Sequence, residues 1–187
     1  MGNVMKEWIG YYENVLSDDI SDGIISMQNG WKASTYSNHK GNIGLEKSKE
    51  RVIMDENYIK NGNTYWSSLC NATRVTIGLY KKKHPYMIRF IPQKLTDFRV
   101  NRYGKGGFMS EHCDNIHHSH GQQYGFPEAS LLFFLNDNYK GGEIVIADTL
   151  YKPKRNSAII FPSNFMYPHY VNKVEEGTRY SIITWLM

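Results

Sequence analysis

Residues 129–147, with the sequence ASLLFFLNDNYKGGEIVIA, contain two short apolar segments separated by turn-forming residues. The segments 129–135 and 143–147 are rich in Leu, Ile, Val and Phe, which suit short strands buried in a sheet. Between them lie Asn136-Asp137-Asn138 and Gly141-Gly142, residue types that adopt turn conformations readily. This arrangement predicts two β-strands joined by a turn.

Similar segments flank this pair on both sides. They span residues 86–91, 96–103, 157–161, 169–174 and 179–186. Turn signals separate them, and no helical periodicity intervenes. Such a series of short strands predicts a β-sandwich or barrel, because a parallel α/β sheet needs a helix between successive strands.

The first 85 residues have a different pattern. A Ser-Asp-Asp N-cap sequence, followed by isoleucines at helical spacing, predicts a helix over residues 17–28. A longer apolar stripe predicts a second helix over residues 62–82. Aromatic and apolar residues at positions 8–15 predict a short amphipathic helix or turn. We therefore expect one domain over residues 1–187, in which residues 1–85 form a helical support region and residues 86–187 form the β core.

Composition and charge exclude several classes of protein. With 41% hydrophobic and 14% aromatic residues, the chain is neither disordered nor fibrous. A net charge of +4 over 187 residues is too small to indicate a nucleic-acid partner. No apolar run approaches the ~18 residues of a membrane span, and the two cysteines, Cys70 and Cys113, suit a reducing compartment. We expect a cytoplasmic protein with no nucleic-acid or membrane partner.

A candidate metal site follows the glycine-rich turn at residues 104–107. In a strand, residues i and i+2 face the same side, so His112 and Asp114 can converge while Cys113 faces away. His169, at the start of a later strand, is a candidate third ligand. Two histidines and one carboxylate are the ligand set of non-haem Fe(II) oxygenases, which leaves positions open for a cosubstrate and O₂.

A basic residue, Arg179, follows His169 through a turn at residues 175–178. A guanidinium beside a metal site is suited to hold the carboxylate of an organic diacid with two hydrogen bonds, and the Ser181 hydroxyl can add a third. In a regular hairpin Arg179 would pair with Val174 and point away from His169. We therefore predict an odd-length turn or a β-bulge that places Arg179 on the metal side.

Together these motifs resemble the 2-oxoglutarate- and Fe(II)-dependent dioxygenases, and in particular their prolyl 4-hydroxylase-like branch. The similarity covers about half of the chain, over residues 96–187. The matching residues are Arg102-Tyr103-x-x-Gly106, His112-x-Asp114, Leu135-Asn136-Asp137 with Gly141-Gly142-Glu143, His169, Arg179-x-Ser181 and Trp185.

The resemblance implies a mainly β fold with flanking helices, built on a double-stranded β-helix, the jelly roll of cupin-like proteins. The implied ligands of Fe(II) are His112, Asp114 and His169. The implied contacts of 2-oxoglutarate are Arg179, which takes the distal carboxylate, with Tyr103, Ser181 and Trp185. O₂ is the second cosubstrate, and ascorbate is an expected reductant. Catalysis is then carried by the three metal ligands and Arg179.

Departures from the branch limit what the resemblance implies about the substrate. Many prolyl 4-hydroxylases have Lys at the position of Arg179 and Thr at that of Ile144, and Met109 stands where a tyrosine often precedes the first ligand. The resemblance implies hydroxylation of an unactivated C–H bond of a prolyl residue in a peptide or protein, with release of succinate and CO₂. A hydroxylase of a free amino acid or other small molecule, and a non-catalytic jelly-roll binding module, are the alternatives.

The loop after the first two ligands allows other interpretations. His117, His118 and His120 could form a zinc site with Cys113, but structural zinc sites usually need four Cys or His ligands at short paired spacings. We interpret residues 117–126 as a candidate lid over the substrate. A nucleic-acid demethylase of the AlkB type would need a second arginine after Arg179, and the remaining residues contain none.

Overall fold

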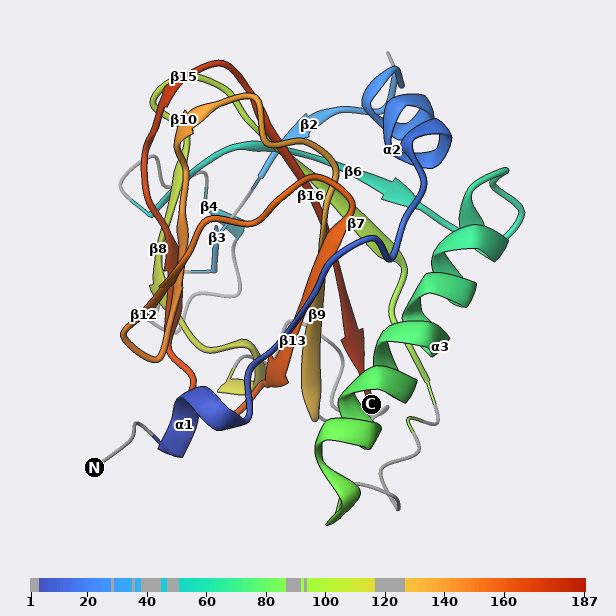
Figure 1. Ribbon diagram of the computed structural model, residues 1–187. Helices are drawn as coiled ribbons and strands as arrows, with labels where there is room; N and C mark the ends of the chain where they lie inside the picture. The colour runs from blue at the N-terminus through green and yellow to red at the C-terminus, as the bar shows by residue number, and fades with distance from the viewer. Residues whose placement is uncertain are drawn as a thin grey trace.

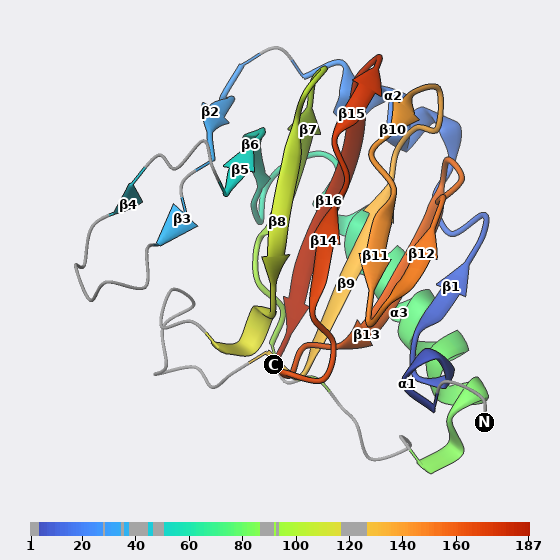
Figure 2. The ribbon, with the colours of Figure 1, turned by 90° about the vertical axis from the view of Figure 1, so that its left-hand side faces the viewer.

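Two antiparallel sheets face each other in the computed structural model, and helices cover the outer side of the larger sheet (Figures 1 and 2). The structure describes residues 4–27, 29–34, 36–37, 45–46, 51–86, 92, 94–116 and 127–187. The prediction of a mainly β protein with flanking helices is confirmed.

Seven strands form the larger sheet, in the order β1-β13-β9-β16-β7-β6-β2. In that order their bounds are Gly10–Tyr12, Ser157–Pro162, Ala129–Phe134, Arg179–Leu186, Phe98–Tyr103, Asp55–Ile59 and Lys32–Ala33. The C-terminal strand β16 lies at the centre, where it pairs with β9 on one side and β7 on the other. Its residues are therefore almost all buried.

Five strands form the smaller sheet, in the order β12-β11-β14-β8-β5. Their bounds are Thr149–Tyr151, Ile144–Ile146, His169–Val171, Phe108–His112 and Val52–Ile53. Two further pairs join β10 (Lys140–Gly141) to β15 (Val174–Glu176), and β3 (Tyr36–Ser37) to β4 (Leu45–Glu46). Each of these pairings is antiparallel, as the turn-rich sequence predicts.

The side-chain alternation of β16 divides the protein interior into two layers. Ile183 and Trp185 belong to the apolar layer between the two sheets, whereas Ile182 and Leu186 belong to the layer between the larger sheet and the helices. Because successive residues of a strand face opposite sides, one buried strand can serve both layers.

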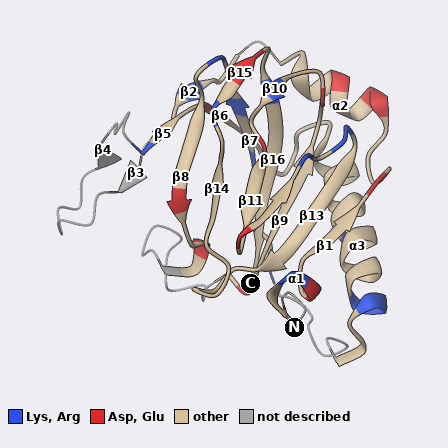
Figure 3. Ribbon diagram, turned by 60° about the vertical axis from the view of Figure 1, so that its left-hand side comes forward, with Lys and Arg blue, Asp and Glu red and all other residues tan. Residues whose placement is uncertain are grey.

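Three helices lie outside the larger sheet or at its edge: α1 (Val4–Glu7), α2 (Asp18–Ile25) and α3 (Trp66–Lys83). Leu69 and Ala72 of α3 pack in the same buried layer as Phe133 of β9. Three lysines occupy the last turn of α3, where cations suit the helix dipole (Figure 3). Among the described helices, none is long and apolar enough to cross a membrane.

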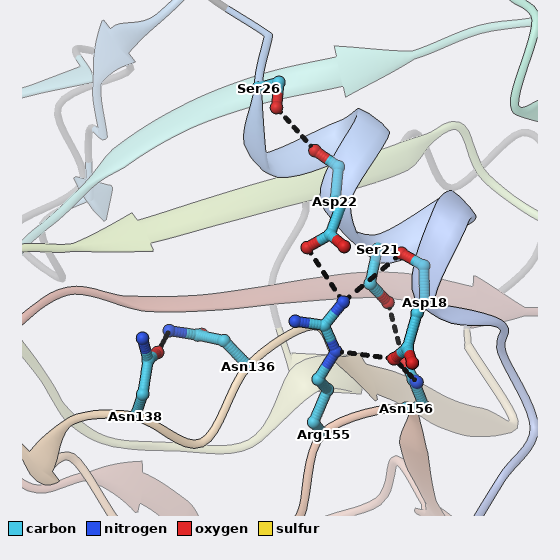
Figure 4. A network of polar contacts seen from close by, with 8 residues as sticks. All are labelled: Asp18, Ser21, Asp22, Ser26, Asn136, Asn138, Arg155 and Asn156. Atoms are coloured by element: carbon cyan, nitrogen blue, oxygen red, sulfur yellow. Dashed lines mark hydrogen bonds and ion pairs between the residues drawn. The ribbon is translucent and has the colours of Figure 1, made fainter.

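A polar network attaches α2 to the turn before β13 (Figure 4). Arg155 Nε donates to Asp18 Oδ1 at 2.8 Å, and Arg155 Nη2 lies 2.8 Å from Asp22 Oδ1. Asn156 Nδ2 also donates to Asp18 Oδ1, and its Oδ1 accepts a hydrogen bond from Ser21. The hydrogen bond from Asn156 and the charge of Arg155 lower the pKa of Asp18. The acidic N-terminus of α2 is thus fixed against the sheet.

The interpretation of residues 1–85 as a helical support region is wrong in one respect. Strands β1, β2, β5 and β6 all come from this region, and they complete both sheets. The segment of β6, next to the edge strand β2, is half-buried and carries charged and polar residues, so its sequence lacks the apolar alternation of a typical strand. The strand expected over residues 86–91 lies, beyond Tyr86, outside the described residues.

The hairpin expected between His169 and Arg179 is also wrong. β14, which begins at His169, pairs with β8 and β11 in the smaller sheet, whereas β16 lies in the larger sheet. Arg179 pairs with Tyr103 and not with Val174. Because the chain crosses from one sheet to the other, both side chains face the space between the sheets without the predicted bulge.

We expect the buried face of α3 to contribute strongly to stability. Leu69 is fully buried and Leu79 is 39% exposed on the same helix, so identical substitutions can be compared. Leu69→Ala should lower the free energy of unfolding by about 3 kcal/mol, because it removes packed methyl groups and leaves a cavity. Leu79→Ala should lower it by about 1 kcal/mol or less. Urea denaturation measures both, and equal losses would contradict the packing described for α3.

Candidate metal centre and cosubstrate site

Three potential metal ligands converge at one end of the space between the sheets. His112 ends β8, Asp114 begins the 3₁₀ turn η2 (Asp114–Ile116), and His169 begins β14. In the antiparallel pairing of β14 with β8, His169 lies directly opposite His112. One ligand atom from each of the three side chains lies within 4.8 Å of the others. Figure 2 shows the end of β8 and the start of β14 at the same end of the sheet.

Backbone carbonyls orient both imidazoles. His112 Nδ1 lies 2.9 Å from the carbonyl oxygen of Ser110, and His169 Nδ1 lies 3.0 Å from that of Tyr167. A carbonyl can only accept, so each Nδ1 carries a proton, and in the neutral imidazole the lone pair is then on Nε2. Both Nε2 atoms lie 3.6 Å from an oxygen of Asp114. The lone pairs are therefore presented where a metal ion would bind.

Asp114 is held from the opposite sheet. Ser130 of β9 donates its hydroxyl to Asp114 Oδ2 at 2.5 Å, and Ser130 Oγ lies 2.7 Å from Ser163 Oγ. Burial by itself raises the pKa of this carboxyl, but His169, His112, the hydrogen bond from Ser130 and the nearby Trp185 together lower the pKa to about 2. The carboxylate is therefore ionised at neutral pH, as a metal ligand must be.

The pKa of His112 is lowered to about 4, chiefly by burial and further by the neighbouring His169. A neutral imidazole is the form that binds a metal ion. His112 and Asp114 are thus in their metal-binding protonation states at neutral pH.

His112 and Asp114, the two ligands that are close in sequence, do not converge in the way expected. β8 ends at His112, and Asp114 belongs to the turn that follows, so a turn and not strand alternation brings the two side chains together. Cys113 faces away, as expected: its Sγ lies 3.7 Å from the carbonyl oxygen of Phe165.

The donor set fits Fe(II). Two histidines and one carboxylate form the arrangement used by non-haem Fe(II) oxygenases. His112, Asp114 and His169 are also the one group of three or more His, Cys, Asp or Glu side chains placed for metal binding in the described part of the chain. The alternative zinc ligands His117, His118 and His120, and the candidate lid at residues 117–126, lie outside the described residues.

Arg179 lies in the same inter-sheet space as a fully buried guanidinium. Its Nη1 donates to Ser181 Oγ at 3.0 Å, whereas Nε and Nη2 have no hydrogen-bond partner among the described residues. The rings of Tyr103 and Phe134 lie 5.0 and 5.3 Å from its Cζ. A buried cation with unpaired donors is costly unless a ligand completes it, and a carboxylate matches the guanidinium geometry best. The arrangement therefore fits the distal carboxylate of 2-oxoglutarate.

The remaining predicted residues divide between the two ends of the site. Tyr103 and Ser181 lie beside Arg179, and burial raises the pKa of the Tyr103 hydroxyl although the charge of Arg179 opposes this. Trp185 shares the inward face of β16 but lies farther along it, near Asp114, where it helps to lower the pKa of that carboxyl. Trp185 is thus placed beside a metal ligand and away from Arg179.

Sequence reasoning missed Ser130, which binds the Asp114 carboxylate directly. A signal for it exists: Ser130 is a polar residue within the otherwise apolar segment 129–135. A buried serine in such a strand requires a hydrogen-bond partner, although its sequence cannot say which one.

Comparison with known proteins agrees with this geometry. Residues 98–187, which contain all seven predicted site residues, match the family model of the 2OG-Fe(II) oxygenase superfamily. About half of the chain is therefore similar to that superfamily. A PKHD-type hydroxylase of Rippkaea orientalis is 33% identical over an alignment of 163 residues that covers 84% of this chain and 63% of the relative. The chain therefore spans less than two thirds of that relative.

Solved oxygenase structures share the fold. A viral collagen prolyl hydroxylase from Paramecium Bursaria Chlorella virus-1 superposes with a TM-score of 0.69 at 19% identity, over 98% of both chains. A prolyl hydroxylase from Trichoplax adhaerens, solved with a peptide fragment of the hypoxia inducible factor oxygen degradation domain, gives 0.68 at 15% identity, over 97% of this chain and 84% of the other. The expected jelly-roll core is thereby confirmed.

We expect Ser130 to support metal binding through Asp114. Ser130→Ala should weaken Fe(II) affinity about ten-fold, because it removes the hydroxyl that fixes the ligating carboxylate. Ser157→Ala is a matched control: Ser157 is also buried in the larger sheet, but it donates to the carbonyl of Lys154. Metal titration under nitrogen measures both variants. An unchanged affinity in Ser130→Ala would contradict the role assigned to this hydrogen bond.

Proposed function

We propose that this protein is an Fe(II)- and 2-oxoglutarate-dependent dioxygenase that hydroxylates an unactivated C–H bond of a prolyl residue in a peptide or protein, releasing succinate and CO₂. One observation carries the proposal: the His112, Asp114 and His169 triad shares one inter-sheet space with the incompletely paired, buried Arg179. The superfamily match over residues 98–187 supports it.

In this proposal the residues of the chain bind Fe(II) and orient its cosubstrates. His112, Asp114 and His169 would hold Fe(II) and leave positions open for 2-oxoglutarate and O₂. Fe(II) with these two cosubstrates supplies the oxidising chemistry. Ser130 and the carbonyls of Ser110 and Tyr167 keep the ligands in place.

Arg179 and its neighbours select the cosubstrate. The free Nε–H and Nη2–H groups would donate to the distal carboxylate, and Ser181 keeps the guanidinium oriented through Nη1. The rings of Tyr103 and Phe134 flank the guanidinium and exclude water, which strengthens the ion pair. The hydroxyl of Ser181 retains its proton for a further hydrogen bond to the same carboxylate.

The proposed substrate, a prolyl residue in a peptide or protein, is inferred from similar proteins. Both the PKHD-type hydroxylase and the prolyl hydroxylases of similar fold support hydroxylation, and one of the latter was solved with a peptide. A hydroxylase of free amino acids is the second candidate. A non-catalytic binding module is disfavoured because all three ligands and Arg179 are present. The unpaired cysteines Cys70 and Cys113 support a reducing, cytoplasmic setting.

The proposed activity is tested in two steps. Fe(II) and 2-oxoglutarate, added under nitrogen, should give a weak visible charge-transfer band that is lost in His112→Ala and in His169→Ala. Mass spectrometry should then find products heavier by about 16 Da, the mass of one oxygen atom, among proline-containing peptides in the presence of O₂. Absence of the band in intact protein would refute the metal assignment. Products from free amino acids alone would favour the second candidate.

We expect Arg179→Met to separate function from stability. The Michaelis constant for 2-oxoglutarate should rise at least about 30-fold, because the buried partner of its carboxylate is removed. The ligand-free protein should not lose stability, since a buried guanidinium with unpaired donors is replaced by an apolar side chain of similar length. Kinetics and urea denaturation measure the two effects. An unchanged Michaelis constant would remove Arg179 from the cosubstrate site.

A further inference from the structure

The inward face of β7 carries a second set of polar side chains beside the metal centre. Tyr103 belongs to the layer between the sheets, whereas Phe98 and Val100 belong to the layer beneath the helices. By alternation, Arg99 and Asn101 therefore face the inter-sheet space together with Tyr103. Neither Arg99 nor Asn101 has a role in the metal or cosubstrate site described above.

Arg99 and Asn101 offer one unpaired donor and one unpaired acceptor, side by side. Arg99 Nε and Asn101 Oδ1 are both buried, and neither has a hydrogen-bond partner among the described residues. Buried polar groups are nearly always hydrogen-bonded, so an orphan donor next to an orphan acceptor indicates a missing ligand. The two residues are two positions apart on the same strand, which separates them by about 7 Å at roughly 3.3 Å per residue.

The position of Arg99 is at the metal end of the site. Its Cζ lies 5.0 Å from the ring of Trp185, and Trp185 in turn lies near the ligand Asp114 and helps to lower the pKa of that carboxyl. Arg99 pairs with Ile183, and Tyr103 pairs with Arg179, so the two arginines lie four residues apart along the sheet. That spacing is about 13 Å at roughly 3.3 Å per residue.

This separation assigns the two arginines to different ligands. A cosubstrate that reaches from the triad to Arg179 extends away from Arg99. The side chain of Arg99 is also 17% exposed, whereas Arg179 is fully buried. A molecule that enters from solvent and reacts at the metal would therefore meet Arg99 first.

The charge of Arg99 already has a counter-ion. Glu56 Oε2 lies 3.9 Å from Arg99 Nη1, and Tyr58, directly opposite Arg99 on β6, borders the same group. Because Glu56 already balances the charge of Arg99, the group that Arg99 Nε still needs is a hydrogen-bond acceptor, which can be neutral. A neutral amide satisfies this need, because it offers a carbonyl to Arg99 and an N–H to Asn101.

We propose that Arg99 and Asn101 bind a backbone amide of the substrate, with Arg99 Nε donating to its carbonyl oxygen and Asn101 Oδ1 accepting its N–H. The inference rests on the proposed function and narrows its substrate to a peptide. Arg99 and Asn101 are then specificity residues for the amide flanking the reacting residue.

The test measures binding in the full chain loaded with Zn(II), a non-reactive substitute for Fe(II), and 2-oxoglutarate. The probes are N-acetyl-L-proline N-methylamide, which is neutral, and N-acetyl-L-proline, which carries a carboxylate. Ligand-observed NMR titration should show that the amide binds, and that Arg99→Lys and Asn101→Leu each weaken it about ten-fold, because each loses one hydrogen bond. The affinity for 2-oxoglutarate, measured by calorimetry, should stay unchanged in Arg99→Lys.

Arg102→Lys is the matched control. Arg102 lies on the opposite face of β7, where it is bound to Asp55 at 2.8 Å, so amide binding should be unaffected. The proposal is overturned if the wild-type protein does not bind the amide, or if the carboxylate probe binds more tightly through Arg99. It is also overturned if Arg99→Lys weakens the binding of 2-oxoglutarate and leaves amide binding unchanged. Because binding needs no turnover, amide binding without hydroxylation would refute the proposed function and leave this inference standing.

Discussion

Two opposite charges, buried in one space between two sheets, impose the main constraint on this structure. The Asp114 carboxylate and the Arg179 guanidinium are both buried, yet they do not pair with each other. Burying an ion is costly unless hydrogen bonds or a counter-ion compensate it. Asp114 is compensated by two imidazoles and a serine, whereas Arg179 has one hydrogen bond and two unpaired groups. A bound dianionic cosubstrate would supply the hydrogen-bond acceptors that Arg179 lacks, and a divalent cation would bind the Asp114 carboxylate.

This constraint explains why both sheets are needed. The smaller sheet supplies His112 and His169, and the larger sheet supplies Ser130 and Arg179. Asp114 follows a strand of the smaller sheet but is bound by a serine of the larger one. A shift of one sheet against the other would therefore separate the carboxylate from its support. The apolar layer that packs the sheets together also fixes the geometry of the metal centre.

The pairing of β16 with β7 orders the polar residues of the site along one axis. Along β16 and β7, the inward positions pass from Arg179 and Tyr103 to Trp185 and Arg99. The first pair is closed off from solvent and suits a small diacid, and the second pair adjoins the metal ligands. One face of two adjacent strands thus accommodates a cosubstrate at one end and presents polar groups for a second ligand at the other.

The sequence by itself determined the C-terminal strands, the ligand types and their motif spacing, because these depend on local alternation and turn chemistry. Period two assigns Arg179, Ser181 and Trp185 to one face whatever that strand pairs with. It says nothing about the partner strand, since hydrogen-bonded neighbours can be distant in the chain. Only the tertiary structure therefore decided that β14 and β16 lie in different sheets and that β6 joins β7. For the same reason, the roles of Ser130 and Arg99 depend on contacts across sheets and strands that no local pattern encodes.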